Sequence, residues 1–518
     1  MNSNDGASPR AMEDLIQELN ERKSQALEMG GAEAVAKHQA TGRLTVRERV
    51  DLLVDPGTWF EVGMFALPEI RRDRPVPGDG VVTGFAEMQG RPVGVIGIDA
   101  TVLAGSTAPV SMRKQGRIAA FASEKGIPLV TLCDADGGRI PDVMGWRFSG
   151  LPLDFSSFLQ PPEGSPEIPR AAAVLGPSYG DSALHASTAH FVVMTENAAV
   201  ALSGPSVVQS AIGEEITDQE LGGPDRALAI GTAHMAVGSE QDAFLAIAAF
   251  LSYLPSNSNL PAPRFESRLP KSSAMDIAGI VPTNPRSAYD MFDVIESIVD
   301  GDSVFPWAQA HGPALITAFA RIDGYPIGIV ANQPTVNAGA LDPAALRKSS
   351  HFAEMCETFN LPLVFLQDVP GLLIGKKAEQ EGIVRGYEDL VARLARSRVP
   401  KVSVVIRKAY GGGHYAMGGK PTRPDFLVAW PSAELGFMAP ETGINTVYRR
   451  RLEAAFAEGG EELEEAVRAE LMSEWQDESR PWEAAAHFYL DDIIDPGTTR
   501  DWMIRAIELS WGPGERVV

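Results

Sequence analysis

The chain has 518 residues, with 45 Lys or Arg against 68 Asp or Glu, and its formal net charge is −23 at pH 7. Apolar residues make up 44% and charged residues 22% of the chain, a balance typical of folded globular domains and not of disordered chains. At about 150 residues per domain, this length predicts two to four domains or two large ones. The negative charge argues against nucleic acid or an anionic membrane as the main partner, because both attract clustered positive charge. An anionic small molecule needs only a local basic patch.

The two cysteines, Cys133 and Cys356, lie far apart in the sequence, so they predict neither a disulfide framework nor a cysteine-based zinc site. The first 23 residues lack the apolar core of a signal peptide. The longest apolar stretch, residues 243–254, is too short to cross a bilayer. We therefore expect a protein of the reducing cytoplasm without membrane insertion.

Taken in chain order, residues 11–38 carry apolar side chains at helical spacing and predict an amphipathic helix pair. Residues 254–273 are rich in Pro, Ser and Asn without periodicity and predict a linker. The chain then divides into two halves of similar size, an N-terminal domain over residues 1–265 and a C-terminal domain over residues 266–518.

The two halves resemble each other. The segment VTGFAEMQGRPVGVIGIDATVLAGSTAPVSMRK from Val82 aligns without a gap with ITAFARIDGYPIGIVANQPTVNAGALDPAALRK from Ile316. The offset of 234 residues (317 minus 83) persists through Asp134 and Asp368 and the glycines that follow them. A constant offset over such a length indicates an internal duplication.

Each copy predicts two strands joined by a turn, a loop of small residues, a helix that carries Arg-Lys, and a β-rich strand. That strand, from Leu129 or Leu363, runs into a glycine loop, the place where an α/β sheet commonly presents its ligands. A second strand with a glycine loop follows, as GPSYGDSALH from Gly176 and RKAYGGGHYAMGG from Arg407. The pattern predicts an α/β protein with two glycine loops in each half.

Backbone amides of such loops can converge on one anionic oxygen, as in an oxyanion hole. The alternative interpretation is that each loop is a tight turn that binds no ligand. Four glycine loops at matching places in the two halves favour ligand binding over this alternative. Nucleotide binding is disfavoured, because GxxxxGK[ST] and GxGxxG patterns are missing from the sequence. His185 and His190 have the wrong spacing for an HExxH zinc site and are interpreted as helix-face residues, so no metal is predicted.

Arg113, Lys114 and Arg117 place three positive charges on two helical turns of an acidic chain. They predict a phosphate-binding patch for a large anionic substrate, because Arg matches phosphate geometry. A solvated helix face is the alternative. Arg347 and Lys348 at the matching place in the second half weaken the functional interpretation, since shared descent alone can preserve the pair.

These residues stand within longer stretches that resemble the carboxyltransferase (β) subunit of biotin-dependent acyl-CoA carboxylases of the propionyl-, acetyl- and methylcrotonyl-CoA types. The resemblance spans nearly the whole chain. Its most specific stretches are GRLTVRERVDLLVDPGTWFEVG, DQELGGPDRALAIGTAH, DIAGIVPTNPRSAYDMFDVIESIVDG, VPKVSVVIRKAYGGGHYAMGG and AWPSAELGFMAPETGIN. The family's fold is a tandem pair of crotonase-type (ClpP/crotonase) β-β-α superhelix domains, which requires a duplication.

The resemblance implies transfer of carboxylate from N-carboxybiotin to the α-carbon of an acyl-CoA, through an enolate held in oxyanion holes of backbone amides. It places acyl-CoA mainly on the N-terminal half of one subunit and biotin on the C-terminal half of its neighbour. The amide loops that it implies comprise Gly138, Arg139, Gly180 and Asp181 on the acyl-CoA side and Gly371, Leu372, Gly412 and Gly413 on the biotin side. His414 and Tyr415 would contact substrate, and Tyr415 weakly suggests a short acyl chain.

The sequence departs from the family at DADGGRI and GPSYGDSA, where the family has DSGGARI and GPCAGGA. Asp136 and Asp181 bring possible negative charge close to a developing enolate.

No Met-Lys-Met biotin acceptor occurs in the sequence, so biotin is expected on a partner that carries the biotin carboxylase and biotin carboxyl carrier functions. The family assembles as a homo-oligomer, and a hexamer made of three dimers is expected. Three alternatives remain open from sequence. They are the carboxyltransferase subunit of a biotin-dependent decarboxylase, a crotonase-like hydratase or isomerase with positioned carboxylates, and a scaffold without catalysis.

Overall fold

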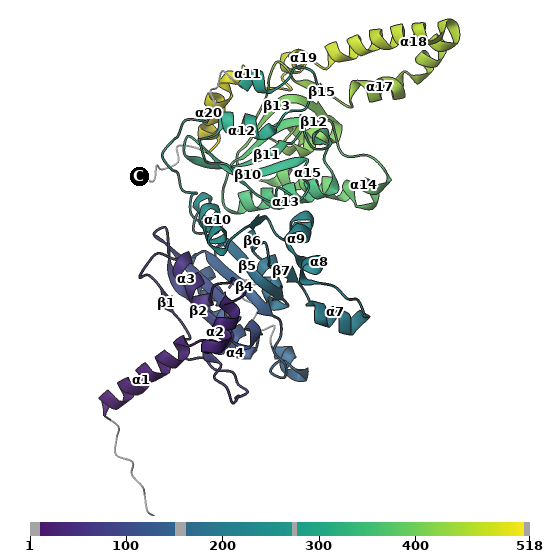
Figure 1. The fold of residues 1–518 in the computed structure, drawn as a ribbon. Coiled ribbons are helices and arrows are strands. Elements are labelled where there is room, and N and C mark those ends of the chain that lie inside the picture. Colours follow the sequence, from purple (N-terminus) through teal and green to yellow (C-terminus); the bar gives the residue numbers. More distant parts are fainter. Residues whose placement is uncertain (1–10, 151–161, 272–276, 512–518) are drawn as a thin grey trace, which may run out of the picture. The chain divides into compact units, whose positions relative to one another are not determined.

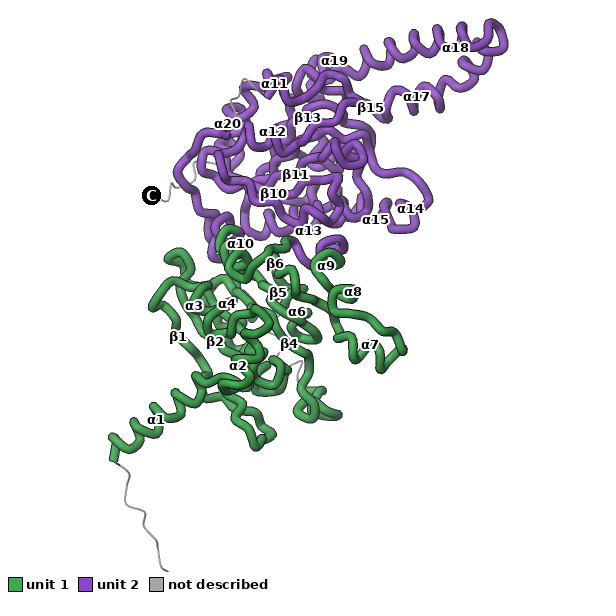
Figure 2. The backbone as a smooth tube through the Cα atoms, viewed as in Figure 1, with its two compact units in different colours: residues 1–227, 235–249 green, residues 228–234, 250–518 purple. Residues whose placement is uncertain are grey.

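A computed structural model describes residues 11–150, 162–271 and 277–511. The chain forms two compact units, one of residues 1–227 and 235–249 and the other of residues 228–234 and 250–518 (Figure 2). The sequence suggested a domain boundary at residue 265, whereas the second unit already begins its long segment at residue 250. The reason is local, because Arg264 forms an ion pair with Asp323 and the Phe265 amide donates to the Gly324 carbonyl at 3.0 Å, which hold the expected linker on the second unit.

The first unit is built on one mixed sheet of eight strands, in the order β1-β2-β3-β4-β5-β6-β8 with β7 paired to β5. Its strands are β1 (Phe60–Glu61), β2 (Val81–Met88), β3 (Arg91–Ile98), β4 (Leu129–Asp136), β5 (Arg170–Tyr179), β6 (Phe191–Thr195), β7 (Ala199–Ala201) and β8 (Met235–Val237). Helices from the start of the chain to residue 253 are α1 (Met12–Leu27), α2 (Ala32–Gln39), α3 (Val46–Leu53), α4 (Pro109–Lys125), α6 (Asp181–Ser187), α7 (Pro205–Ile212), α8 (Asp218–Gly222), α9 (Pro224–Ile230) and α10 (Glu240–Tyr253).

The second unit repeats this sheet, in the order β16-β14-β13-β12-β11-β10-β9 with β15 paired to β13. Its strands are β9 (Phe305–Pro306), β10 (Leu315–Ile322), β11 (Tyr325–Asn332), β12 (Leu363–Val369), β13 (Lys401–Tyr410), β14 (Phe426–Ala429), β15 (Glu434–Gly436) and β16 (Asp492–Ile493). Its helices are α11 (Ile277–Ile280), α12 (Met291–Ile298), α13 (Pro343–Thr358), α14 (Lys376–Gln380), α15 (Ile383–Arg396), α16 (Gly411–Ala416), α17 (Pro440–Val447), α18 (Arg449–Glu478), α19 (Pro481–Ala486) and α20 (Thr499–Trp511).

The predicted duplication is confirmed element by element. The antiparallel hairpin β2–β3 corresponds to β10–β11, helix α4 to α13, and the parallel pair β4–β5 to β12–β13 (Figure 1). The parallel strands are buried on both faces, so they are almost continuously apolar in sequence. The predicted α/β architecture of two crotonase-type halves is therefore correct.

Two further features follow from the sequence. The expected N-terminal helix pair is present as α1 and α2. In the second unit, α18 breaks at Gly460 and turns back, so that its second part packs against its first part and α17 around the buried side chains of Ile444, Leu452 and Leu471 (Figure 1). Among the described residues, no helix is long and apolar enough to cross a membrane.

Candidate functional site

The first glycine loop of each unit begins where β4 or β12 ends. A short parallel bridge links Thr107 to Gly138 and, in the second unit, Leu341 to Leu372. The Thr107 amide donates to the carbonyl of Gly137, the residue before Gly138, at 2.8 Å. In the same way, the Leu341 amide donates to the carbonyl of Gly371, the residue before Leu372, at 3.1 Å. The Gly138 and Leu372 amides donate to no backbone acceptor recorded in the described chain, because alternate amides of an extended strand point away from the bridge.

The second glycine loop packs directly on the first. A Cβ added to Gly180 would lie 3.3 Å from the Gly137 Cα, and one added to Gly413 would lie 2.9 Å from the Gly371 Cα. Helices α6 and α16 begin in these loops, and the first amides of a helix have no partner within it. Each unit therefore gathers amides without a backbone acceptor from two loops in one small region.

Two of the expected donors are engaged elsewhere. The Arg139 amide donates to the Thr107 carbonyl at 2.7 Å, and the Gly180 amide donates to the Leu202 carbonyl at 3.1 Å. The Arg139 side chain is buried against Asp79. In the first unit, the amides of Gly138 and Asp181 are thus the better candidates for an oxyanion hole.

A buried carboxylate lies beneath the first loop of each unit and is paired with a cation. Asp134 forms ion pairs with Arg43 at 2.8 Å and Arg49 at 3.0 Å, whereas Asp368 pairs with Arg407 at 2.9 Å within the sheet. The place that matches Arg407 is Gly176, where a Cβ would lie 2.3 Å from an Asp134 carboxylate oxygen. Because the buried Asp134 carboxylate needs a cationic partner and Gly176 cannot provide one, Arg43 and Arg49 of the N-terminal segment take the role that Arg407 has in the second unit.

The two carboxyls that distinguish the first unit's loops have raised pKa values. Burial raises the pKa of Asp181, an effect that Thr107 and the first amides of α6 partly offset. For Asp136, partial burial is the first cause and the charge of Asp218 the second. Both shifts favour the neutral acid, which lessens the conflict with a developing enolate that the sequence had suggested.

Helix α4 separates the three basic residues that the sequence analysis grouped. Arg113 pairs with Glu69, and the Arg117 guanidinium lies 5.1 Å from the Phe121 ring centroid. The Lys114 ammonium donates to the carbonyls of Gly78 at 2.9 Å and Val81 at 2.5 Å, and burial lowers its pKa to about 8.

The second unit repeats the Lys114 arrangement. Lys348 donates to the carbonyl of Leu315, the counterpart of Val81, at 2.5 Å. The repeated lysine therefore fixes the start of a strand in both copies.

On the second unit's loop, His414 is largely enclosed and its Nδ1 lies 2.8 Å from the Gln367 side-chain oxygen. Burial lowers the pKa of His414 to about 4, so the ring is neutral at neutral pH and donates from Nδ1. Tyr415 is 42% exposed beside it. Of these two expected substrate-binding residues, Tyr415 is the one open to solvent.

The sequence analysis missed a cavity of about 920 Å³ in the first unit, between the α1–α2 segment and residues 100–104. Four basic residues line it: Lys37, His38, Arg43 and Arg74. Lys37 and Arg74 have no carboxylate partner in the described part of the chain. Thr107, which bridges to Gly138 of the first loop, comes three residues after this wall in the chain.

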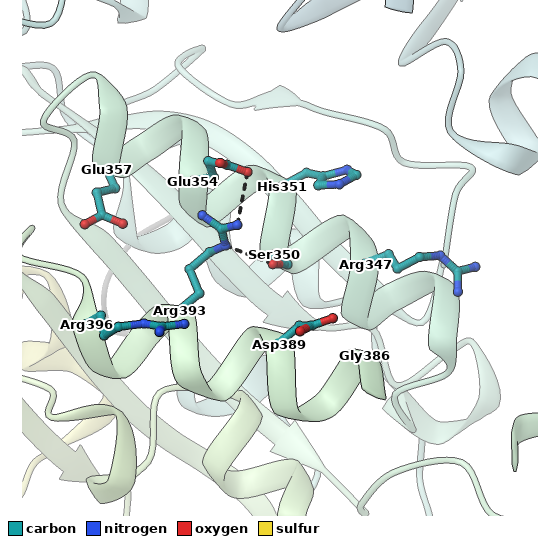
Figure 3. Close-up of a pocket in the computed structure, with 9 residues that line it drawn as sticks. All are labelled: Arg347, Ser350, His351, Glu354, Glu357, Gly386, Asp389, Arg393 and Arg396. Atoms are coloured by element: carbon teal, nitrogen blue, oxygen red, sulfur yellow. Dashed lines mark hydrogen bonds and ion pairs between the residues drawn. The ribbon is translucent and has the colours of Figure 1, made fainter. Parts of the chain in front are cut away.

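A second cavity, of about 570 Å³, is a charged groove between α13 and α15 (Figure 3). Arg393 is fixed there by Ser350 at 3.0 Å and Glu354 at 3.2 Å. Acidic and basic side chains offset each other along the groove, and none of the predicted site residues lines it. Tyr387, also on α15, lies against Gly412, so this helix joins the groove to the second glycine loop of its unit.

Within the described residues, no three His, Cys, Asp or Glu side chains are grouped as metal ligands. Both cysteines are buried thiols, and burial raises the pKa of Cys133 to about 12.

Comparison with known proteins agrees with this architecture. The Carboxyl transferase domain model matches residues 37–516. The propionyl-CoA carboxylase carboxyltransferase subunit of Haloferax mediterranei is 36% identical over 506 residues, 96% of each chain. The methylmalonyl-CoA decarboxylase α subunit of Veillonella parvula is 32% identical over 505 residues, again 96% of each. The crystal structure of transcarboxylase 12S, a hexamer with methylmalonyl-CoA bound, superposes with a TM-score of 0.89 at 34% identity and covers 98% of this chain and 96% of its own.

Two duplicated α/β halves with paired amide loops, together with these similarities, define an acyl-CoA carboxyltransferase. The chain belongs to the Carboxyl transferase domain family, among the carboxyltransferase (β) subunits of biotin-dependent acyl-CoA carboxylases.

Proposed function

We propose that the first unit binds an acyl-CoA thioester, that the second binds the ureido ring of biotin, and that each stabilises an oxyanion with its own amide loops. The observation that supports this most directly is the repeated meeting of two amide loops in both units. Carboxybiotin, when bound, would supply CO2, and the ureido anion that remains could take the α-proton. The chain then needs no general base of its own, and its task is to hold the two oxygens.

On the acyl-CoA side, Gly138 and Asp181 would donate their amides to the thioester oxygen as the α-proton leaves. On the biotin side, Leu372, Gly412 and Gly413 would donate to the ureido oxygen, and Gly371 gives the close approach that their loop needs. A Cβ on Gly412 would lie 3.3 Å from the Tyr387 ring and 3.4 Å from Leu372 Cδ1, so glycine leaves the space for a ligand against these amides.

For the CoA phosphates, we propose the cavity of the first unit, with Lys37 and Arg74 as the binding cations. Arg113 is less suitable because Glu69 already neutralises it. Lys37→Glu and Arg74→Glu should each raise the KM for acyl-CoA about tenfold while leaving the KM for free biotin unchanged, because biotin carries no phosphate. Arg113→Glu serves as the matched surface control. Equal effects of all three substitutions would contradict this assignment.

We propose a homo-oligomer that acts with a partner carrying biotin, because transcarboxylase 12S is described as a hexamer and related β subunits belong to biotin-dependent carboxylases. Tyr415 favours a short acyl chain. Purification of the native complex, followed by bicarbonate fixation with ATP over acetyl-, propionyl- and 3-methylcrotonyl-CoA, tests this function. Fixation with none of them, or turnover of enoyl-CoA without biotin, would contradict it.

The reverse reaction, decarboxylation, is the second candidate, which the similarity to the Veillonella decarboxylase subunit supports. The purified complex separates the two: a biotin carboxylase in the complex favours fixation, and a membrane-bound sodium pump favours decarboxylation.

A further inference from the structure

In both units, the strand that leads into the second amide loop ends in a buried tyrosine. The hydroxyl of Tyr179 donates to the Asp218 carboxylate, and that of Tyr410 donates to the Glu434 carboxylate at 2.5 Å. We infer that Tyr179 with Asp218, and Tyr410 with Glu434, are positioning residues that fix the two amide loops for catalysis. This inference rests on the proposed role of those loops as oxyanion holes.

The origin of the two carboxylates is the main argument. Glu434 begins β15, directly opposite Lys408, two residues before Tyr410. In the first unit, the residue opposite Pro177, two residues before Tyr179, is Ala199, which has no acceptor in its side chain. The two carboxylates therefore do not stand at equivalent places of the duplicated strand pair, and shared descent does not explain a carboxylate at both.

The first unit takes its carboxylate from a different element. Asp218 is the first residue of α8, which packs on β7. Each unit therefore presents an acid to the same hydroxyl from a non-equivalent place in the chain. An arrangement reached in two ways indicates a requirement at this point of the fold.

The requirement concerns the backbone that follows. Gly180 and Gly411 come directly after the tyrosines with φ of 64° and 54°, and neither has a side chain that could anchor the loop. In each unit, the tyrosine is thus the last residue before the proposed amide donors of the second loop whose side chain can anchor the backbone.

The bond that holds it is strong. Hydrogen bonds to a charged acceptor are shorter and stronger than neutral ones. Burial, followed by the hydrogen bond to the carboxylate, raises the pKa of both tyrosines, so each remains a donor. A misplacement of about 1 Å in such a site can cost about a hundredfold in rate.

The test uses Tyr410→Phe in the full complex, with the best substrate among acetyl-, propionyl- and 3-methylcrotonyl-CoA. We expect kcat to fall about ten- to hundredfold, with the KM for acyl-CoA unchanged. Glu434→Gln should retain more activity than Tyr410→Phe, because its amide oxygen still accepts the hydroxyl. The double variant should lose no more than Tyr410→Phe alone, since the two side chains act as one pair.

Tyr325→Phe is the matched control. Tyr325 is also buried in the second unit and accepts a hydrogen bond from Arg264 at 2.7 Å, away from the loops. This control should keep the wild-type kcat, and both Tyr→Phe variants should have similar melting temperatures.

A Tyr410→Phe variant with wild-type kcat, or one whose lost activity tracks a melting temperature far below that of Tyr325→Phe, would overturn the inference. Gly412→Pro, compared with wild type, separates this result from failure of the proposed function. If Gly412→Pro is as active as wild type, the amide loops are not oxyanion holes. If only Gly412→Pro is inactive while Tyr410→Phe is normal, the loops act without the tyrosine pair.

Discussion

At Asp181, the first unit has a carboxyl where the family's GPCAGGA motif has glycine. The carboxyl is enclosed beside Thr107, and burial raises its pKa. Ionisation there would place a negative charge beside the amide that is proposed to stabilise an enolate. The amide itself belongs to the backbone and survives any substitution except proline. The side chain and the backbone of this residue can therefore be tested separately.

We predict that Asp181→Asn stabilises the protein at neutral pH. The carboxyl has a higher pKa folded than unfolded, so below the unfolded pKa of about 3.8 it costs nothing, and the cost of burying it grows as pH rises toward the folded pKa. Asparagine has a similar shape and no charge. Thermal unfolding at pH 4, 6 and 8 should show a gain in melting temperature that increases with pH. A gain that is equal at all three values would mean that ionisation of Asp181 is not the cause.

At the scale of elements, sequence reasoning predicted most of the fold and less of the site. The duplication predicted matching strands in the two halves, because aligned segments with the same apolar pattern form the same buried sheet. The four loops were predicted from their many glycines. The structure explains these glycines, because the loops approach each other so closely that a larger residue would not fit at places such as Gly413. The patch on α4 was predicted from spacing alone. Spacing cannot reveal that Lys114 bonds two carbonyls from a distant turn.

The cavity with Lys37 and Arg74 escaped prediction for a related reason. Its walls come from the α1–α2 segment and from residues 100–104, which are far apart in sequence. The engaged amides of Arg139 and Gly180 were equally hidden, because their acceptors lie on other loops. Local pattern identifies which residues can act, and tertiary hydrogen bonding decides which of them remain available.

The β5–β6 pairing gives an element-scale prediction about acid stability. His190, just before β6, accepts a hydrogen bond at Nδ1 from the Arg170 amide at 3.1 Å. Burial and then the Arg170 charge lower the pKa of His190 to about 4. The unfolded chain binds the proton first, so stability is lost as pH falls from about 6.5 to about 4, by up to about 3 kcal/mol from this group.

Chemical denaturation of wild type and His190→Gln across this pH range measures the effect. The variant should show a shallower loss of unfolding free energy between pH 6.5 and 4. His351→Gln, on the exposed face of α13, serves as the control and should keep the wild-type slope. Parallel curves for wild type and His190→Gln would contradict the assignment.

At the scale of the whole molecule, duplication gave one chain two amide sites with different sequences around the same backbone geometry. The first unit's loops carry Asp136 and Asp181, whereas the second unit's loops carry Pro370 and Gly412 at the corresponding places. In the proposed mechanism, carboxyl transfer needs two oxyanions to be stabilised in one reaction, one on each substrate. A duplicated fold meets that need with a single gene product. The remaining question is whether the two sites that cooperate belong to one chain or to two.

Proline substitutions can answer this question, because proline removes one amide donor. Asp181→Pro should disable the acyl-CoA site and Gly412→Pro the biotin site, and loss of one such donor typically costs about a hundred- to a thousandfold in rate. Both residues lie in the first turn of a helix, where proline is tolerated. Asp181→Ala keeps the amide and is the matched control for Asp181→Pro. Gly412→Pro is compared with wild type, because a Cβ at 412 would itself enter the space proposed for the ligand. Each proline homo-oligomer should be almost inactive.

Co-expression of the two proline variants then distinguishes the arrangements. If the acyl-CoA site of one subunit works with the biotin site of its neighbour, random pairing leaves about a quarter of the interfaces with both sites intact, and about a quarter of the wild-type activity should return. Light scattering must first show that each variant and the mixture assemble as wild type does, since a misfolded loop would also abolish activity. Assembled mixtures as inactive as the separate variants would place both cooperating sites within one chain, because no exchange of subunits could then restore a complete pair.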